Sequence, residues 1–461
     1  MSKTALLVAA LLITALVVRI GYVEHTPFKA INDAGTYNRL ASMIATTGDY
    51  HTGSAPGSGA GGSRGPTAYF PPGFPYFLAA VDILTGHQAG HKPAIQPERI
   101  AQAVAGTVTV GLIGLVALEA FGAGAALASM ALAAFYPVLI ELSGTLVAEN
   151  LLVVFELAAV WTALRIKHAR RPYAWIAATG VLTGLATLTH QNAILLLIPL
   201  ALAAWSVAQR KPDRTRPRVR ALAAPTILLI LTTCATIAPW TIRNAIELHH
   251  FVPVSDESGI TLVGTYNPAS AAFAPVPYKW RYILKIPQDR TLVRTAGRYD
   301  EVALGDKFQS QALHYIDEHP LAPLQVAYHN TLRMFELEGP YAWHASALAI
   351  GLPVAVARTG VAAFWLLCGL ALLGAFTRMA RRAPRWLWLV PLLLALSVVF
   401  VNVETPRFRE PIDPFLILLA GCAVATAVQR LPLRRAPVRR GRRASQLPRD
   451  AQVVEMGQRL A

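Results

Sequence analysis

The sequence has little of the charge that keeps a soluble protein in solution. Only 15% of its 461 residues are charged, whereas 54% are hydrophobic and the mean hydropathy is +0.42. These values exclude a soluble enzyme of this length and indicate a membrane protein. Cysteine is scarce as well: the three cysteines all lie in apolar runs and form no CxxC motif. Neither a disulfide framework nor a thiolate metal site is indicated.

Long apolar runs are what the sequence has instead. They approach the length that a helix needs to cross a hydrocarbon core about 30 Å thick. The clearest are residues 5–22, 100–118, 125–140, 146–164, 175–188, 193–207, 221–240, 360–376, 386–401 and 414–428. The first follows Lys3 and has no small-x-small cleavage site after it, which predicts a retained anchor. We therefore expect an all-α bundle of about ten spans.

The basic residues are distributed unevenly between the two sides of this bundle. If the N-terminus is cytoplasmic and ten spans alternate, the inner segments hold 24 of the 42 Lys and Arg within only 68 residues. This positive-inside bias predicts that both termini are cytoplasmic, in a plasma or inner membrane. The Lys and Arg clusters in these inner segments lack interleaved aromatic side chains, so nucleic acid is not an expected partner. We expect one membrane domain over residues 1–430 and a basic, disordered cytoplasmic tail over 431–461, which could rest on anionic lipid.

Two large segments then face outward, at about residues 20–99 and 241–356. The first contains a Gly/Ser-rich loop, "SAPGSGAGGSRGPTA", followed by "YFPPGFPYFLAAVDILTG". The latter predicts a short helix at the outer interface, although a short span paired with another unrecognised one remains an alternative. The second segment contains a helical stretch over residues 298–335 that His319-Pro320 should interrupt.

Ionisable and polar side chains gather at the outer ends of the spans. A charge this close to hydrocarbon is costly and usually has a function. These side chains are Asp33, Glu141, Glu149, His190, Gln191, Asn192, Arg243, Asn244, Arg407, Arg409 and Glu410. Carboxylates beside arginines suit a phosphate-bearing substrate, because guanidinium forks bind phosphate oxygens and a carboxylate can accept a proton. Such a phosphate would reach this depth on a lipid.

Each of these residues also has a structural interpretation. Asp33 could be the N-cap of the helix that follows it, and Glu149 could cap the next span. His190 could lie in the hinge between two closely connected helices. Arg243 and Arg407 could extend their charged ends from the hydrocarbon to the interface.

Taken in order along residues 5–430, several stretches resemble the GT-C superfamily of integral-membrane glycosyltransferases. The similarity is to its protein O-mannosyltransferase and lipid A aminoarabinose transferase branch. It rests on "NDAGTYNRLASMIATTGDY", "YFPPGFPYF", "SGTLVAENLL", "APWTIRNAIELHHFVPVS" with "GTYNP", and "PRFREPIDPFLILLAG". The resemblance implies an all-α membrane bundle of about ten to thirteen spans with an extracytoplasmic active site. It also implies transfer of a sugar from a polyprenyl-phosphate donor with inversion at the anomeric carbon.

The resemblance further implies roles for individual residues. Asp33 and Glu149 would be the catalytic acids, and the substrate would be bound by Tyr37, His190, Arg243, Asn244, Arg407 and Arg409. Many relatives have a second acid directly after the first-loop Asp, where this chain has Ala34, and an Arg-Pro pair near the position of His190. No tightly held metal is expected, and a weakly bound divalent cation at Asp33 remains open.

Two other functions remain as alternatives. The same outer charges could form the vestibule of a lipid or sugar transporter or flippase, although the polar groups lie at one face rather than at mid-membrane. An O-antigen ligase or polymerase would use related donors from the same side. The acceptor, whether protein, glycan or lipid, cannot be inferred from the sequence.

Overall fold

The computed structural model describes residues 3–52, 65–86, 95–206, 218–295 and 299–430. Most of these residues are helical, as predicted. The strands within the described ranges form one two-stranded antiparallel hairpin of β1 (His51–Thr52) and β2 (Gly65–Pro66), with His51 opposite Pro66. The centre of the Gly/Ser-rich loop and the basic tail both lie outside the described residues.

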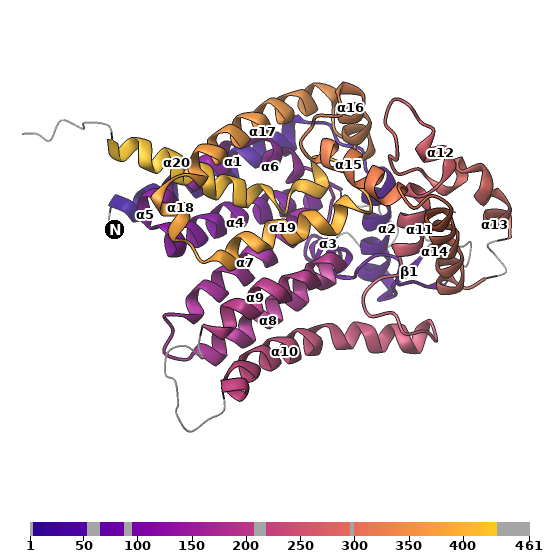
Figure 1. Cartoon of the computed structure of the whole chain (residues 1–461), viewed down its shortest axis with the longest axis horizontal. Helices are drawn as coiled ribbons and strands as arrows, with labels where there is room; N and C mark the ends of the chain where they lie inside the picture. The colour runs from indigo at the N-terminus through magenta and orange to yellow at the C-terminus, as the bar shows by residue number, and fades with distance from the viewer. Residues whose placement is uncertain (1–2, 53–64, 87–94, 207–217, 296–298, 431–461) are drawn as a thin grey trace, which may run out of the picture.

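The ten apolar runs all fall on helices of the bundle (Figure 1). In chain order these helices are α1 (Lys3–His25), α4 (Ile95–Phe121), α5 (Ala123–Phe135) with α6 (Pro137–Leu142), α7 (Glu149–Ile166), α8 (Pro172–Thr189), the 3-10 turn η1 (Gln191–Leu196) with α9 (Leu197–Trp205), α10 (Arg218–Glu247), α17 (Val354–Ala375), α19 (Arg385–Val399) and α20 (Asp413–Arg430). Within the described ranges, α1, α4, α10, α17 and α20 are each long and apolar enough to cross a membrane. The protein is a multi-pass membrane protein.

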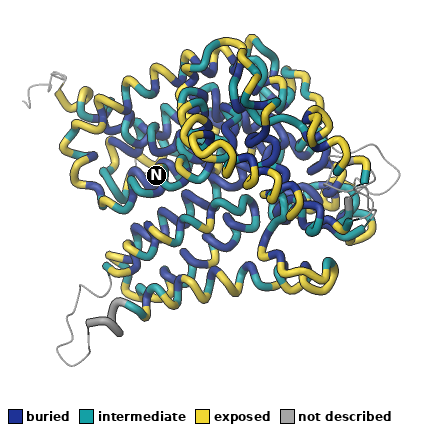
Figure 2. The backbone as a smooth tube through the Cα atoms, turned by 45° about the vertical axis from the view of Figure 1, so that its right-hand side comes forward, coloured by how far each residue is buried: buried dark blue, intermediate teal, exposed yellow. Residues whose placement is uncertain are grey.

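The outside of the bundle is apolar. Leu6, Leu231 and Leu373 are each at least 60% exposed, and the outward turns of the helices are the exposed ones in Figure 2. A soluble protein would bury such side chains, whereas lipid tails solvate them. Close helix contacts depend on small residues: a Cβ added at Gly374 of α17 would lie 1.8 Å from the carbonyl oxygen of Leu419 in α20. The bundle therefore packs by backbone proximity, as helices in lipid commonly do.

The two predicted outer segments lie at the same end of the bundle, opposite the N-terminus (Figure 1). The first segment forms α2 (Asn32–Thr47) and α3 (Gly73–Leu84), which pack together through Tyr37, Leu40, Phe74 and Leu78. The short helix predicted after the Gly/Ser-rich loop is thus present as α3. Its 12 residues are too few to span a membrane.

The second segment folds into a small helical layer with its own apolar core. Its elements are α11 (Ser258–Thr265), α12 (Pro268–Ala271), η2 (Ile283–Lys285), η3 (Pro287–Asp289), α13 (Arg290–Arg294), α14 (Glu301–Glu318), α15 (Ala322–Met334) and α16 (Pro340–Ala349). Residues of α11 and α14 form the centre of this core. The predicted break at His319-Pro320 separates α14 from α15, since proline disfavours helix at the residue before it. The basic turn α18 (Arg378–Arg382) lies at the opposite end, between α17 and α19.

Candidate active site

A cavity of about 540 Å³ lies where the outer segments meet the bundle. Its walls come from α2, the loop before α3, the α8–η1 junction, α11, the loop before η2, and the segment between α19 and α20. The lining mixes aromatic rings with many polar and charged side chains. The residues used below are Asp33, Thr36, Tyr37, Arg39, His190, Glu257, Trp280, Tyr282, Glu404, Arg407 and Phe408.

The central feature of the cavity is an arginine held between two carboxylates. Arg407, in the 3-10 turn η5 (Arg407–Arg409), donates from Nη1 to Asp33 Oδ2 at 2.5 Å and from Nε to Glu149 Oε1 at 2.5 Å. The Asp33 side chain is 41% exposed, against 1% for Glu149 and 9% for Arg407. Asp33 therefore faces the cavity, and Glu149 lies behind Arg407.

The start of α2 places Asp33. The helix begins at Asn32, whose positive φ of 50° is a conformation that asparagine tolerates better than most residues. The Asn32 Nδ2 donates to the Ala349 carbonyl oxygen at 2.8 Å, which ties α2 to the end of α16. The N-cap is Ile31, without a side-chain bond. The interpretation of Asp33 as a cap is therefore wrong, because its carboxylate lies in the first turn and binds Arg407.

Glu149 does not act as a helix cap either. It is the first residue of α7, the N-cap position is Ala148, and no side chain caps this helix. Its Oε2 is buried and has no hydrogen-bond partner within the described part of the chain. The structure thus places Glu149 outside the lining of the cavity. Its carboxylate contacts Arg407, which also binds Asp33, and does not face the cavity itself.

Comparisons with known proteins agree with this architecture. Residues 70–240 match the family model described as dolichyl-phosphate-mannose-protein mannosyltransferase. The oligosaccharyltransferase AglB of Archaeoglobus fulgidus, in complex with an inhibitory peptide and a dolichol-phosphate, superposes with a TM-score of 0.53 at 15% identity. That match covers 93% of this chain and 51% of AglB. The apo form of the same enzyme gives 0.53 at 14% identity, with 94% and 51% covered. The chain has the GT-C fold.

Other matches are weaker. ArnT from Cupriavidus metallidurans, bound to undecaprenyl phosphate, gives a TM-score of 0.41 at 16% identity, covering 93% of this chain and 79% of that one. No curated protein matches the chain significantly by sequence. The chain spans about half the length of the archaeal oligosaccharyltransferases, 49% to 51%. What it shares with them is the GT-C fold of membrane glycosyltransferases.

Two further residues predicted to bind substrate line the cavity of this GT-C fold. Tyr37 packs against Phe70 and Phe74, with ring centroids 4.6 and 5.0 Å away. His190 lies in the hinge between α8 and η1, and its ring meets the edge of Phe408. Burial lowers the pKa of the His190 imidazole, so the ring is neutral near pH 7. His190 is therefore both the hinge residue and part of the wall.

The structure places the remaining predicted residues elsewhere. Arg243 donates to the carbonyl oxygens of Thr67 at 2.7 Å and Tyr50 at 2.9 Å. Asn244 is buried and donates to the Val252 carbonyl at 3.0 Å. These two residues fix the hairpin and the loop after α10 against the bundle.

Arg409 is also buried away from the cavity. It is paired with Glu336 at 2.7 Å and Asp413 at 3.1 Å, and its guanidinium lies 3.5 Å from the centroid of the Phe364 ring. Its two ion pairs join the end of α15 to the start of α20. In this GT-C fold, Arg407 and Arg409 face different surroundings although only one residue separates them.

Sequence reasoning missed three charged groups of the cavity: Arg39, Glu257 and Glu404. Glu257 occupies the N-cap position of α11 without a side-chain capping bond, and its Oε1 accepts from Gln191 Nε2 at 3.3 Å. Burial, and then repulsion by Asp33, raise the pKa of Glu257 to about 8. The carboxyl is therefore largely protonated near pH 7. No sequence signal singled out these three residues, because a single charged side chain in an outer segment looks the same whether it faces a cavity or solvent.

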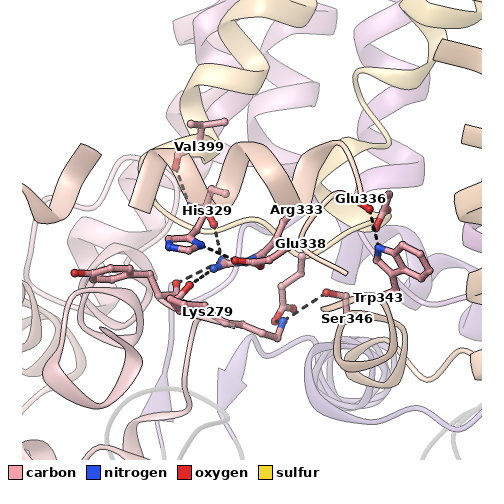
Figure 3. A network of polar contacts seen from close by, with 12 residues as sticks. Lys279, His329, Arg333, Glu336, Glu338, Trp343, Ser346 and Val399 are labelled. Atoms are coloured by element: carbon pink, nitrogen blue, oxygen red, sulfur yellow. Dashed lines mark hydrogen bonds and ion pairs between the residues drawn. The ribbon is translucent and has the colours of Figure 1, made fainter. Parts of the chain in front are cut away.

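Glu404 connects the cavity to a polar network in the outer layer (Figure 3). It accepts from Lys279 Nζ at 2.9 Å. Next to this pair, Arg333 of α15 binds Glu338, which also contacts His329 Nδ1 at 2.8 Å. The network therefore holds the loop before η2 against α15 and the cavity wall.

The described residues contain no group of three or more His, Cys, Asp or Glu side chains arranged to hold a metal. A weakly bound divalent cation at Asp33 stays a prediction, with Asp33 as the exposed carboxylate available to it.

Proposed function

We propose that this chain is a glycosyltransferase that moves a sugar from a polyprenyl-phosphate donor to an acceptor, with inversion of the anomeric carbon. The observation that carries the proposal is the half-exposed Asp33 carboxylate, held on Arg407 in a cavity at one end of an apolar bundle. The matched family model is described by a dolichyl-phosphate-linked mannose donor. A structure with the same fold was solved with a dolichol-phosphate. Both support a lipid-phosphate donor for this chain.

In the proposed reaction, the acceptor hydroxyl oxygen bonds to the anomeric carbon from the face opposite the phosphate. The bond from that carbon to the phosphate oxygen breaks, and the phosphate keeps the electron pair and remains on the polyprenyl chain. Asp33 accepts the hydroxyl proton, for which Oδ1 is available because Arg407 holds Oδ2. Since phosphate is already a good leaving group, positioning and charge stabilisation supply most of the rate.

Arg407 and Glu149 have supporting roles in this proposal. Arg407 orients Asp33, and its positive charge lowers the electrostatic cost of a second negative charge close to the Asp33 carboxylate. Glu149 fixes Arg407 from behind through the Nε bond, so that Nη1 points at Asp33. Glu149 is thus a positioning residue, whereas Asp33 is the base.

We further propose that the cavity faces the extracytoplasmic side of a plasma or inner membrane, with both termini cytoplasmic. The basic inner segments support this orientation. Single cysteines at Ser310 in α14 and His168 between α7 and α8, both exposed, would test it in intact cells. An impermeant maleimide should label the first and not the second. The reverse pattern would overturn the orientation.

The activity is tested with purified protein and radiolabelled polyprenyl-phosphate sugars, using a cell-envelope fraction as acceptor. We expect acceptor-dependent release of polyprenyl phosphate. Asp33→Asn should slow that release by about 10²- to 10⁴-fold, the usual range for a lost general base. Asp49→Asn is the matched control, because Asp49 is exposed in the same outer segment and lies outside the cavity lining.

Each result separates the possible functions. A wild-type protein that binds the lipid but consumes none of the donors would refute the transferase and favour a transporter or flippase. A donor that must carry a pyrophosphate link would identify a ligase or polymerase instead. Full activity of Asp33→Asn would refute the role of Asp33 as base.

A further inference from the structure

Two guanidinium groups line the cavity within the described residues, and they differ in their surroundings. Arg407 is held by two carboxylates, Asp33 and Glu149. Lys279 is not part of the lining but is paired with the cavity residue Glu404. Arg39 is different: it lines the cavity and has no carboxylate partner among the described residues. It is therefore the cation whose charge is free for a ligand.

The position of Arg39 is fixed by α2 itself. Side chains on a helix lean toward its N-terminus, and Arg39 follows this direction: its Nη2 donates to Thr36 Oγ1 at 2.9 Å. A Cβ added at Gly35 would lie 3.9 Å from Arg39 Nη1, so the guanidinium lies along the first turn of the helix. Asp33 belongs to the same turn. Arg39 and the proposed base are thus carried on one rigid element.

The other charged groups of the cavity determine what the position of Arg39 offers to a phosphate ligand. Asp33 and Glu404 line the same space, and Glu149 lies behind Arg407. Three carboxylates therefore surround two paired cations, Arg407 and Lys279, so an entering phosphate meets a net negative charge. An unpaired guanidinium presents several N–H donors in a planar fork that fits phosphate oxygens. Its attraction also grows as negative charge builds on the leaving phosphate.

We propose that Arg39 binds the phosphate of the lipid-linked donor and of the polyprenyl phosphate product. This inference rests on the proposed function, because it assigns a ligand to the same cavity. Arg39 takes the role that the sequence had suggested for Arg243 and Arg409, both of which are engaged elsewhere. Thr36 holds the guanidinium in place and leaves its other N–H groups for the phosphate.

Binding of polyprenyl phosphate to the full chain in detergent tests the inference. The variants are Arg39→Ala and Arg39→Lys, and the control is Arg290→Ala, an exposed arginine at the start of α13 outside the cavity. We expect Arg39→Ala to weaken binding about 10- to 100-fold, as for loss of hydrogen bonds to a charged group. Arg39→Lys should lose less, and Arg290→Ala should bind like wild type.

The unphosphorylated polyprenol distinguishes a phosphate contact from a general change of shape. Its binding should be the same in wild type and Arg39→Ala, and the thermal midpoint of the variant should match wild type. The affinity of wild type for polyprenyl phosphate should also fall more steeply with salt than that of Arg39→Ala. Equal loss for polyprenol and polyprenyl phosphate would overturn the inference, because it indicates a structural role.

The inference and the proposed function can fail separately. If wild type transfers sugar and Arg39→Ala keeps the wild-type KM for donor and the wild-type affinity for polyprenyl phosphate, Arg39 is not the phosphate ligand and the transferase stands. If wild type transfers no sugar, the transferase fails. The binding comparison then still decides whether Arg39 holds a lipid phosphate.

Discussion

The two carboxylates that share Arg407 should contribute very differently to stability. Glu149 is 1% exposed, so Glu149→Gln removes one member of a buried ion pair. Breaking such a pair usually costs about 3–5 kcal/mol, and we expect about 3 kcal/mol here because Arg407 keeps Asp33. Asp33 is 41% exposed, so Asp33→Asn should cost about 0–1 kcal/mol. Both substitutions keep the shape of the side chain, which excludes cavity formation as the cause.

Thermal unfolding in detergent, followed by tryptophan fluorescence, measures this difference. We expect a clearly lower midpoint for Glu149→Gln and a nearly unchanged one for Asp33→Asn. Glu119→Gln is the control, since Glu119 forms a 2.5 Å pair with Arg165 in a more exposed setting, with 19% and 42% of the side chains accessible. It should resemble Asp33→Asn. An equal loss for all three, or a larger loss for Asp33→Asn, would refute the argument from burial.

Three more predictions concern other parts of the fold. Burial and neighbouring carboxylates raise the pKa of Asp256 to about 8. Between about pH 4 and pH 8 the folded chain therefore keeps a proton that the unfolded chain loses, so the free energy of unfolding falls as pH rises. The midpoint of Asp256→Asn relative to wild type should therefore increase from pH 5 to pH 8, and parallel curves would contradict this. Gly374→Ala should destabilise the protein by at least about 1–3 kcal/mol, because the added methyl group meets the backbone of α20. Gly369→Ala, in the same helix but with open space around it, should be tolerated. Equal thermal midpoints for the two variants would argue against close packing of α17 on α20. Lys279→Met should lower the thermal midpoint because it leaves Glu404 unpaired, and adding Glu404→Gln to the same chain should restore part of the loss. If the losses of the two single variants simply add in the double variant, the pair contributes nothing to stability.

The helices, and the position of both outer segments at one end of the bundle, could be predicted because lipid imposes strong rules on sequence. Every backbone group inside hydrocarbon must be bonded within its own helix, so each span requires a long apolar run. Alternation of ten runs then assigned each polar span end to a side. That was enough to group Asp33, His190 and Arg407, which line one cavity. Tyr37, which lines it too, was singled out only by the family resemblance.

The individual roles of the arginines could not be predicted in this way. An arginine at a span end has the same sequence signature whether it binds a ligand, a carboxylate or a carbonyl oxygen. Arg243 binds carbonyl groups and Arg409 binds Glu336 and Asp413, and none of these contacts follows from sequence spacing. Arg39 and Glu257 became visible only when loops and helix ends had been placed in space.

The departure at Ala34 also has a physical explanation. Ala34 is 3% exposed and belongs to the apolar cluster between α2 and α3, so an acid at this position would lose its hydration without facing the cavity. A second carboxylate is supplied instead by Glu149, which reaches Arg407 from the start of α7. Asp33 and Glu149 are thus joined through one arginine that follows them by 374 and 258 residues. Because Glu149 is buried and Asp33 is not, the two acids have different roles in the proposed reaction: Glu149 holds the arginine, and Asp33 is the one that would contact the substrate.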